Sequence, residues 1–297
     1  MMDQAERLRM MVGNHQHQKP MMKKAKIITV ASGKGGVGKT NVTMNMALEL
    51  AKQGKRVVIL DADLGLSNVE VLFGIIPSYT LSDMLFGGKS LMDILTPGPF
   101  GIYFISSGSG VQDLVQLSPI ELQNCIVQLQ PLDQVADIIF IDTGAGVSQT
   151  VIQFIQASDD TIVVTTPEPT SITDAYALIK TLKNNVSSQD RFPNIQLLIN
   201  RVDTQEEGEE VFLKIQRASE KFLNTTIHNL GYIPYDVKMI QAVKLQKPLC
   251  IAYPQSSAAQ AFYSIACKML NIKEEKIQPT GLGGFMKKIF HLFGETI

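Results

Sequence analysis

The chain has 297 residues, of which 45% are hydrophobic and 19% are charged, and its formal net charge is −1. This composition predicts a globular protein with a sizeable core, and the near-zero charge excludes an overall electrostatic attraction to nucleic acid or anionic membrane. Its three cysteines form no C-x-x-C pair, and no apolar run reaches the ~18–20 residues of a membrane span, so we expect a cytoplasmic protein without an iron–sulfur site.

Between residues 26 and 270 the sequence alternates short apolar runs with longer stretches of helical periodicity, such as 39–53 and 171–185. Five runs are apolar on both faces, as in strands that are covered by helices on each side. They are KIITVAS at 26–32, RVVILDAD at 56–63, DIIFIDTG at 137–144, DTIVVTTP at 160–167 and IQLLINRV at 195–202. This order predicts an α/β fold with a doubly wound, mostly parallel sheet that binds its ligands at the carboxyl ends of the strands.

The composition divides the chain into five parts. The predicted α/β domain spans 26–270, and the flanking stretches 13–25 and 271–284 have the glycine, proline and polar residues of linkers. Beyond these linkers lie an N-terminal segment at 1–12 and an amphipathic C-terminal segment at 285–297.

The strand at 26–32 leads into GKGGVGKT and then into a predicted helix, which is the expected context of a G-x-x-x-x-G-K-T phosphate-binding loop. Glycines let backbone N–H groups face the phosphates, and the helix N-terminus adds partial positive charge. Lys39 is expected to reach the β and γ phosphates, and the Thr40 hydroxyl to ligate Mg²⁺. The predicted nucleotide-binding residues of this loop are Gly33, Lys34, Gly35, Gly36, Val37, Gly38, Lys39 and Thr40.

Three acidic residues follow at the ends of predicted strands. Asp61 and Asp63 are two residues apart in a strand and so point the same way, which lets one hold magnesium while the other orients water for attack on the γ phosphate. Asp142 ends the strand at 137–144, where it can bond magnesium-bound water, and the loop 143–146 can then respond to the γ phosphate. The predicted metal ligands are therefore Thr40, Asp61 and Asp142.

The identity of the base depends on the end of the strand at 195–202. Asn200 is placed there, where its amide can contact a purine edge. The stretch Asn200–Arg201–Val202–Asp203 is similar to the N-K-x-D guanine motif, but it has arginine in place of lysine, and Asp203 can equally cap a turn. We expect ATP, and these motifs alone leave GTP open.

Lys34 is a second lysine in a loop that needs only one to hold its own nucleotide. It is either a solvated loop residue or a cation that reaches a second nucleotide across a face-to-face dimer, as an arginine finger does. Here the sequence resembles the deviant phosphate-loop ATPases of the MinD/ParA family, whose signature K-G-G-x-x-K-T is present at 34–40. The resemblance covers about residues 26–270, through DADLGLSNVEVLFG, DTGAG, TTPEPTSITDAYALIK, LLINRV and GYIPYD.

This resemblance implies an ATP-dependent homodimer that encloses two ATP molecules. Lys34 then contacts the partner's phosphates and Asp63 positions water, so that these two residues and Lys39 form the predicted catalytic set. Asn41 stands where many members have a second threonine, at the position that contacts the α phosphate. The residues implied at the base are Asn200, Arg201, Pro234, Tyr235 and Asp236.

The C-terminal stretch GFMKKIFHLFGETI predicts an amphipathic helix. On a helical wheel one arc of about 160° is apolar and two lysines lie opposite, which is typical of a helix that lies in a membrane surface. The alternative is a helix docked on the protein's own surface, and both can hold in turn, docked without ATP and released with it. The predicted membrane-binding residues are Phe285, Met286, Ile289, Phe290, Leu292 and Phe293.

The N-terminal stretch DQAERLRMM has a plausible helix cap but is too short to hold a helix alone in water. It is either a disordered end or a segment that folds on a partner. It resembles the D-Q-A-x-x-L-R activator motif of the flagellar FlhG (FleN/YlxH) family, which implies binding to the GTPase FlhF, with Gln4 inserted near its GTP. The matching residues are Asp3, Gln4, Ala5, Leu8 and Arg9.

Together these resemblances imply a slow, Mg²⁺-dependent ATPase that is monomeric when empty or bound to ADP. The ATP-bound dimer is expected on the inner face of the cell membrane, where it controls flagellar number and placement. Family partners also include flagellar switch (C-ring) proteins, whereas DNA binding is not expected. The alternatives are a MinD-type division-site ATPase and an adaptor that uses nucleotide only to fold.

Overall fold

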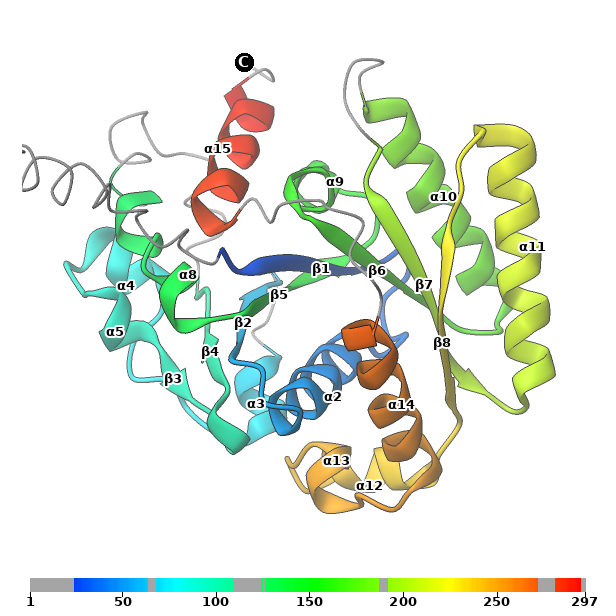
Figure 1. Ribbon diagram of the computed structural model, residues 1–297, viewed down its shortest axis with the longest axis horizontal. Coiled ribbons are helices and arrows are strands. Elements are labelled where there is room, and N and C mark those ends of the chain that lie inside the picture. Colours follow the sequence, from blue (N-terminus) through cyan, green and yellow to red (C-terminus); the bar gives the residue numbers. More distant parts are fainter. Residues whose placement is uncertain are drawn as a thin grey trace, which may run out of the picture.

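The structure is a computed structural model that describes residues 24–63, 68–108, 124, 126–186, 192–271 and 281–294, without the side chains of 271 and 292–294 (Figure 1). Its centre is a sheet with the strand order β3-β4-β2-β5-β1-β6-β7-β8. Only β3 runs antiparallel to its neighbour, and every other pairing is parallel. The predicted doubly wound, mostly parallel α/β fold is therefore confirmed.

The five predicted apolar runs form the middle of this sheet. They are β1 (Lys26–Ser32), β2 (Val57–Ala62), β5 (Ile138–Ala145), β6 (Asp160–Thr165) and β7 (Asn194–Val202). The sequence did not predict the outer strands, which are β3 (Thr96–Pro97), β4 (Tyr103–Ile105) and β8 (His228–Pro234). The first two are very short, and β8 is buried at only two positions because it is an edge strand. Its pattern therefore lacks the continuous apolar run of a central strand.

One face of the sheet is covered by a layer of helices that packs on every second strand residue, such as Ile28 and Val30. These helices are α2 (Lys39–Lys52), α3 (Val69–Phe73), α12 (Val237–Lys244), α13 (Leu249–Ala252) and α14 (Ser257–Asn271). A 3₁₀ turn at Pro99–Gly101 lies beside α2. The start of α2 at Lys39 agrees with the predicted helix at 39–53.

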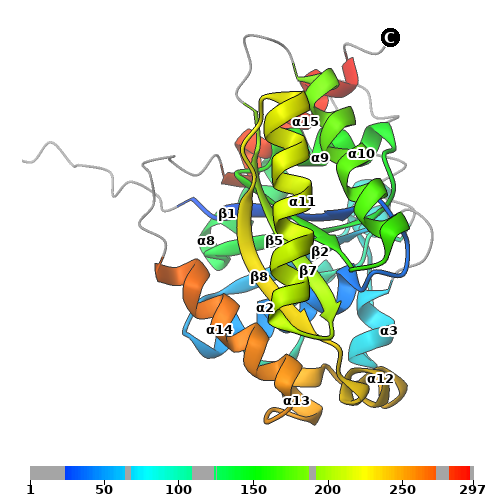
Figure 2. The ribbon, with the colours of Figure 1, turned by 90° about the vertical axis from the view of Figure 1, so that its right-hand side faces the viewer.

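The opposite face carries a second layer, packed on alternate residues such as Ile27 and Ala31. It consists of α4 (Leu81–Phe86), α5 (Leu91–Ile94), α8 (Leu132–Val135), α9 (Gln149–Ala157), α10 (Pro169–Asn185), α11 (Gln205–Leu223) and α15 (Gly281–Gly294). Figure 2 shows α11 and α14 on opposite sides of the edge strand β8. Within the described residues, no helix combines the length and the hydropathy that crossing a membrane requires.

Candidate functional site

The phosphate-binding loop connects β1 to α2 at the carboxyl edge of the sheet. Two of its glycines have no room for a side chain, since a Cβ on Gly33 would lie 2.0 Å from the Asp174 carbonyl oxygen and one on Gly38 would lie 2.6 Å from Asn200 Nδ2. Gly38 also has a φ of 95°, in the left-handed region that favours glycine. No side chain caps α2, so its first N–H groups stay available to an anion.

Lys39, the first residue of α2, is only 8% exposed. Burial lowers the pKa of its ammonium, and the charges of Asp142 and Asp63 oppose that shift. The ammonium is thus held near two carboxylates at the place where phosphates would enter. Such an arrangement supplies one fixed positive charge to an anionic ligand.

The two acids of β2 have different surroundings. Asp61 is fully buried and accepts hydrogen bonds from the backbone N–H groups of Asp63 (3.1 Å), Asn68 (3.0 Å) and Val69 (3.2 Å), so it fixes the ends of the loop that follows β2. Asp63 accepts from Asn68 Nδ2 at 3.4 Å. Its carboxylate also lies beside Gly144, where an added Cβ would be 3.3 Å from Asp63 Oδ1. Asp63 therefore lies just after β2, beside the last residues of β5.

Asp142 lies directly beside Asp61 in the register of β2 and β5. Its side chain is buried, with Oδ1 accepting from the Thr43 hydroxyl at 3.0 Å. Burial, and after it the charge of Asp61, raises the pKa of Asp142 to about 7, against the opposing effects of Thr40, Lys39 and Thr43. Its Oδ2 atom is buried without any hydrogen-bond partner.

These donors fit a magnesium ion. A hydroxyl and two carboxylates are hard oxygen ligands of the kind Mg²⁺ binds beside substrate phosphates. The unpartnered Asp142 Oδ2 is a costly feature in an empty protein, and a cation or its bound water would satisfy it. Thr40 and Asp61 both lie next to Asp142, and the role of these three residues as Mg²⁺ ligands stays a prediction.

The raised pKa of Asp142 predicts a pH effect on the nucleotide-free protein. Between pH 4 and about 7 the folded protein keeps a proton that the unfolded chain has released, so stability falls as pH rises and then levels off above about 7. The free energy of unfolding changes by about 1.4 kcal/mol for each unit by which the pKa is raised. In thermal unfolding with EDTA, the unfolding temperature of Asp142→Asn should rise relative to that of the wild type across that pH window. A difference in unfolding temperature that does not change with pH would contradict this prediction.

Lys34 is bound within its own chain. Its ammonium donates to Glu168 Oε2 at 2.9 Å and to Thr170 Oγ1 at 2.7 Å, at the start of α10. The hydrogen bond from Lys34 lowers the pKa of the Glu168 carboxyl, and the charge of Arg201 adds to the effect. Glu168 is exposed and Lys34 is half-buried, with side-chain exposures of 58% and 36%, so solvent screens this ion pair and it contributes little to stability.

The predicted base contacts support the loop in this structure. Asn200 Nδ2 donates to the Val37 carbonyl at 2.8 Å, and the Arg201 guanidinium donates to the Gly36 carbonyl at 2.8 Å. Arg201 has a φ of 61°, a strained conformation of the kind that concentrates at functional sites. The structure thus gives both residues a role in fixing the phosphate loop, and their contact with adenine stays a prediction.

The remaining predicted base residues follow β8. Tyr235 is 53% exposed, whereas Asp236 caps α12 through Lys238 N (2.8 Å) and binds the start of α14 through Ser257 Oγ (3.1 Å). Burial works to raise the pKa of Asp236, but these hydrogen bonds together lower it. Pro234 ends β8, and Asn41 lies half-buried in the first turn of α2, where its carbonyl accepts from Asn45.

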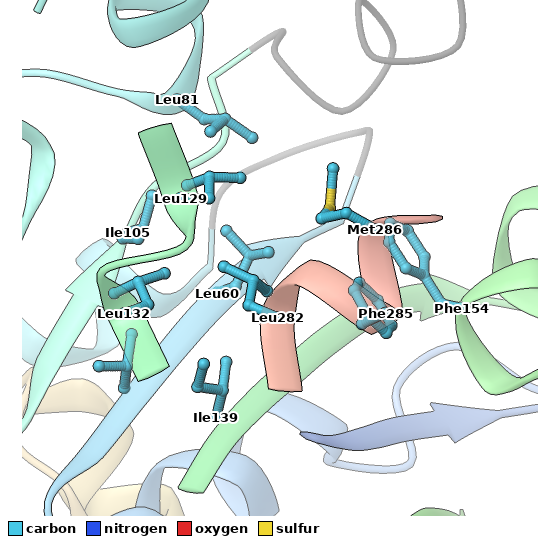
Figure 3. Close-up of a pocket in the computed structure, with 11 residues that line it drawn as sticks. Leu60, Leu81, Ile105, Leu129, Leu132, Ile139, Phe154, Leu282, Phe285 and Met286 are labelled. Atoms are coloured by element: carbon cyan, nitrogen blue, oxygen red, sulfur yellow. The ribbon is translucent and has the colours of Figure 1, made fainter. Parts of the chain in front are cut away.

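The C-terminal helix α15 is docked on the sheet, and it begins at Gly281, before the segment 285–297 assigned from the sequence. Phe285, Met286 and Ile289 are at most 3% exposed, and the Phe285 ring stacks on Phe154 of α9 with centroids 5.9 Å apart. Figure 3 shows this side of α15 facing apolar side chains of the sheet and neighbouring helices. The residues that form this groove are Val58, Leu60, Leu81, Ile105, Leu129, Leu132, Ile139 and Phe154.

Asp133 of α8 fastens the start of this helix. Its Oδ1 accepts from Leu282 N at 2.9 Å and from Ala25 N, just before β1, at 3.3 Å. A Cβ on Gly281 would lie 2.5 Å from Asp133 Oδ2, so the close approach requires glycine. Phe290 is half-buried, and the side chains of Leu292 and Phe293 lie outside the described residues.

The structure brings Lys39, Thr40, Asp61, Asp63 and Asp142 into one site and places Lys34 at its rim. The predicted partner-binding residues Asp3, Gln4, Ala5, Leu8 and Arg9 lie outside the described residues. Sequence reasoning missed Asn68, although a polar residue soon after Asp63 in a strand-end loop could have indicated it. It also missed Glu168 and Thr170, for which no local signal exists, because their role comes from the fold.

Comparison with known proteins shows which family this chain is similar to. A family model described as ParA: NUBPL iron-transfer P-loop NTPase matches residues 23–270. The chain is 41% identical over 248 residues to the antiactivator FleN of Pseudomonas aeruginosa, which covers 84% of this chain and 87% of that protein. It is 32% identical over 273 residues to the flagellum site-determining protein YlxH of Helicobacter pylori, which covers 91% of each.

Among solved structures, the septum site-determining protein MinD of Pyrococcus horikoshii, complexed with Mg-ADP, is similar with a TM-score of 0.65 and 26% identity. The match covers 84% of this chain and 99% of that one.

Proposed function

Because the chain belongs to the ParA family of P-loop NTPases and, within it, to the flagellar FlhG (FleN/YlxH) group, we propose that it is an ATPase switch that controls the number and placement of flagella. The observation that carries this proposal is the site itself, where a phosphate loop with two lysines meets three strand-end carboxylates. The chain is more similar to FleN and YlxH than to P. horikoshii MinD, which favours a flagellar role over a division-site role.

In the proposed ATPase, Lys39 binds the β and γ phosphates from the first turn of α2. Thr40, Asp61 and Asp142 would hold Mg²⁺, which would supply positive charge to the phosphates when bound. Asp63 orients the attacking water, and the hydrogen bond from Asn68 fixes the carboxylate that does so. Turnover is slow, so that hydrolysis acts as a timer for the switch.

ATP controls dimerisation in this proposal, and Lys34 is the residue that contacts the nucleotide of the partner subunit. In the free chain its ammonium is bound to Glu168 and Thr170. To reach the partner's phosphates it must leave these two groups, and the phosphates offer more negative charge than one carboxylate. The exchange is inexpensive because Glu168 is exposed and Lys34 only half-buried, so solvent already weakens their ion pair.

The same switch controls attachment to the inner face of the cell membrane through α15. Three of the six residues that the sequence assigns to the membrane, Phe285, Met286 and Ile289, are buried by α15 against its own chain. Docking and membrane binding therefore exclude each other, which supports the interpretation that the helix is docked without ATP and released with it. Two released helices tethered in a dimer bind ~10²–10⁴-fold more tightly than one.

A physical link between the nucleotide and α15 runs through α9. The sequence predicted a loop at 143–146 that responds to the γ phosphate, but residues 143–145 end β5, and the loop after β5 runs from Gly146 to the start of α9 at Gln149. Gly146 N donates to the Ser32 carbonyl at 2.9 Å, which ties this loop to the strand leading into the phosphate loop. Because Phe154 of α9 stacks on Phe285, a shift of α9 would disturb the docked helix.

The N-terminal segment 1–12 is proposed to bind the GTPase FlhF and stimulate GTP hydrolysis, and flagellar switch proteins are proposed as further partners. A GTPase assay of purified FlhF with the full chain, with a chain lacking 1–12, and with the peptide 1–12 tests the first of these. We expect the full chain to stimulate, the truncated chain to fail and the peptide to stimulate in part. Gln4→Ala is the matched point variant and should lose stimulation while keeping ATP binding.

Two results distinguish the proposed switch from its alternatives, one of which is an adaptor that uses nucleotide only to fold. If the truncated chain stimulates FlhF as well as the full chain, the partner assignment fails. If Lys39→Ala, which loses ATP, supports the complete flagellar function in cells, the adaptor is favoured over the ATPase switch.

A further inference from the structure

Thr43, in the second turn of α2, is a fully buried polar residue that the proposed hydrolysis does not use. Its single hydroxyl proton is shared between two acceptors, the carbonyl oxygen of Lys39 at 3.1 Å and Oδ1 of Asp142 at 3.0 Å. It therefore touches two residues of the site from within the helix that begins at the phosphate loop.

The contact with Lys39 fixes the direction of the Thr43 side chain. A threonine in a helix has two favoured χ1 rotamers, and a hydrogen bond to the carbonyl four residues earlier selects one of them. Since the carbonyl partner here belongs to the first residue of α2, the hydroxyl is held in place relative to the phosphate loop.

The contact with Asp142 then fixes a carboxylate that comes from another element, β5. The terminal torsion of an aspartate is broad, so a buried carboxylate without partners could turn. Thr43 binds Oδ1, while Oδ2 stays buried and without a hydrogen-bond partner. The carboxylate thus has one oxygen fixed by the protein and one left for an incoming group.

We propose that Thr43 is a positioning residue that orients the Asp142 carboxylate toward Mg²⁺ or its bound water. This inference rests on the proposed function, since it assumes that Asp142 serves the ion. Thr43 is not itself a ligand, which distinguishes it from Thr40, and groups of this kind commonly contribute 10–100-fold to metal affinity.

Calorimetric titration of the full chain with ADP, once with Mg²⁺ and once with EDTA, tests this role. The ratio of the two affinities measures what the ion contributes. Thr43→Val keeps the shape and removes the hydroxyl, and we expect it to lower the ratio about 10-fold or more without changing the affinity in EDTA. Thr43→Ser keeps the hydroxyl and should stay near the wild type.

Thr29→Val is a matched control, because Thr29 is equally buried and its hydroxyl bonds Ser158 and the Phe154 carbonyl, outside the site. It should leave the ratio unchanged even if it lowers the unfolding temperature. If Thr43→Val does not fold, Thr43→Ser against Thr43→Ala makes the same comparison, because these two variants differ by the hydroxyl alone.

Three results would overturn the inference. They are a Thr43→Val protein with the wild-type ratio, a Thr43→Ser protein as impaired as the valine variant, and an equal loss of affinity with and without Mg²⁺. A wild type whose ADP affinity does not respond to Mg²⁺ would instead overturn the magnesium site itself, and the inference with it.

Discussion

Replacing Lys34 with alanine is expected to lower ATP hydrolysis by about 10³-fold while leaving ATP affinity nearly unchanged, as for the loss of an arginine finger. The structure supports this separation of the effect on hydrolysis from the effect on ATP affinity. The hydrogen bonds of the Lys34 ammonium go to Glu168 and Thr170, whereas the loop that would cradle the chain's own phosphates is held by Asn200 and Arg201. Removing the ammonium therefore leaves the cradle in place and removes only what would reach across a dimer.

Phosphate release and ATP-analogue binding measure the two parts of this result, and light scattering after gel filtration measures dimerisation. Lys39→Ala is the control in the same loop and should lose nucleotide binding itself. Glu168→Gln weakens the hold on Lys34 without removing the lysine, so we expect it to dimerise at lower ATP concentration. A Lys34→Ala protein that hydrolyses ATP at the wild-type rate would show that Lys34 acts in neither subunit.

Removing residues 281–297, and with them α15, is expected to abolish ATP-dependent binding to liposomes and also to destabilise the ATPase domain. The second effect follows from the structure, because Leu282, Phe285, Met286 and Ile289 are nearly fully buried on the sheet. Each such side chain contributes about 1.5–3 kcal/mol when it is removed from water. Urea unfolding and liposome pelleting measure the two losses, while ADP binding should persist, since the phosphate loop lies on another part of the sheet.

Asp133→Ala is the opposite test of the same helix. It removes the acceptor of Leu282 N without changing the apolar face of α15, so it should weaken docking and increase liposome binding in the absence of ATP. Asp93→Ala is a matched control, because Asp93 also caps a helix start, but it does so at α5 through Ser90. Liposome binding by Asp133→Ala that still requires ATP would contradict the proposed exchange between docking and membrane.

Local patterns determined most of the nucleotide site. The strand-loop-helix order around 33–40 and the acids at the ends of β2 and β5 depend on nearest neighbours and on the two-residue period of strands, so the sequence alone located them. Parallel strands then bring their carboxyl ends to one edge, which placed Asp61 beside Asp142 as expected. The edge strand β8 escaped prediction because its burial is intermittent.

The sequence by itself determined the fold class, the phosphate loop, the acids beside it and the amphipathic character of the C-terminal helix. Only the tertiary structure decided which groups these side chains contact: Lys34 binds Glu168, Asn200 binds the Val37 carbonyl, and Phe285 stacks on Phe154. The reason is physical, since an apolar helix face gains as much from its own core as from a lipid surface, and periodicity does not distinguish the two. Likewise, a lysine or an amide binds whichever acceptor the fold brings within reach, across more than a hundred residues of chain in each polar case here.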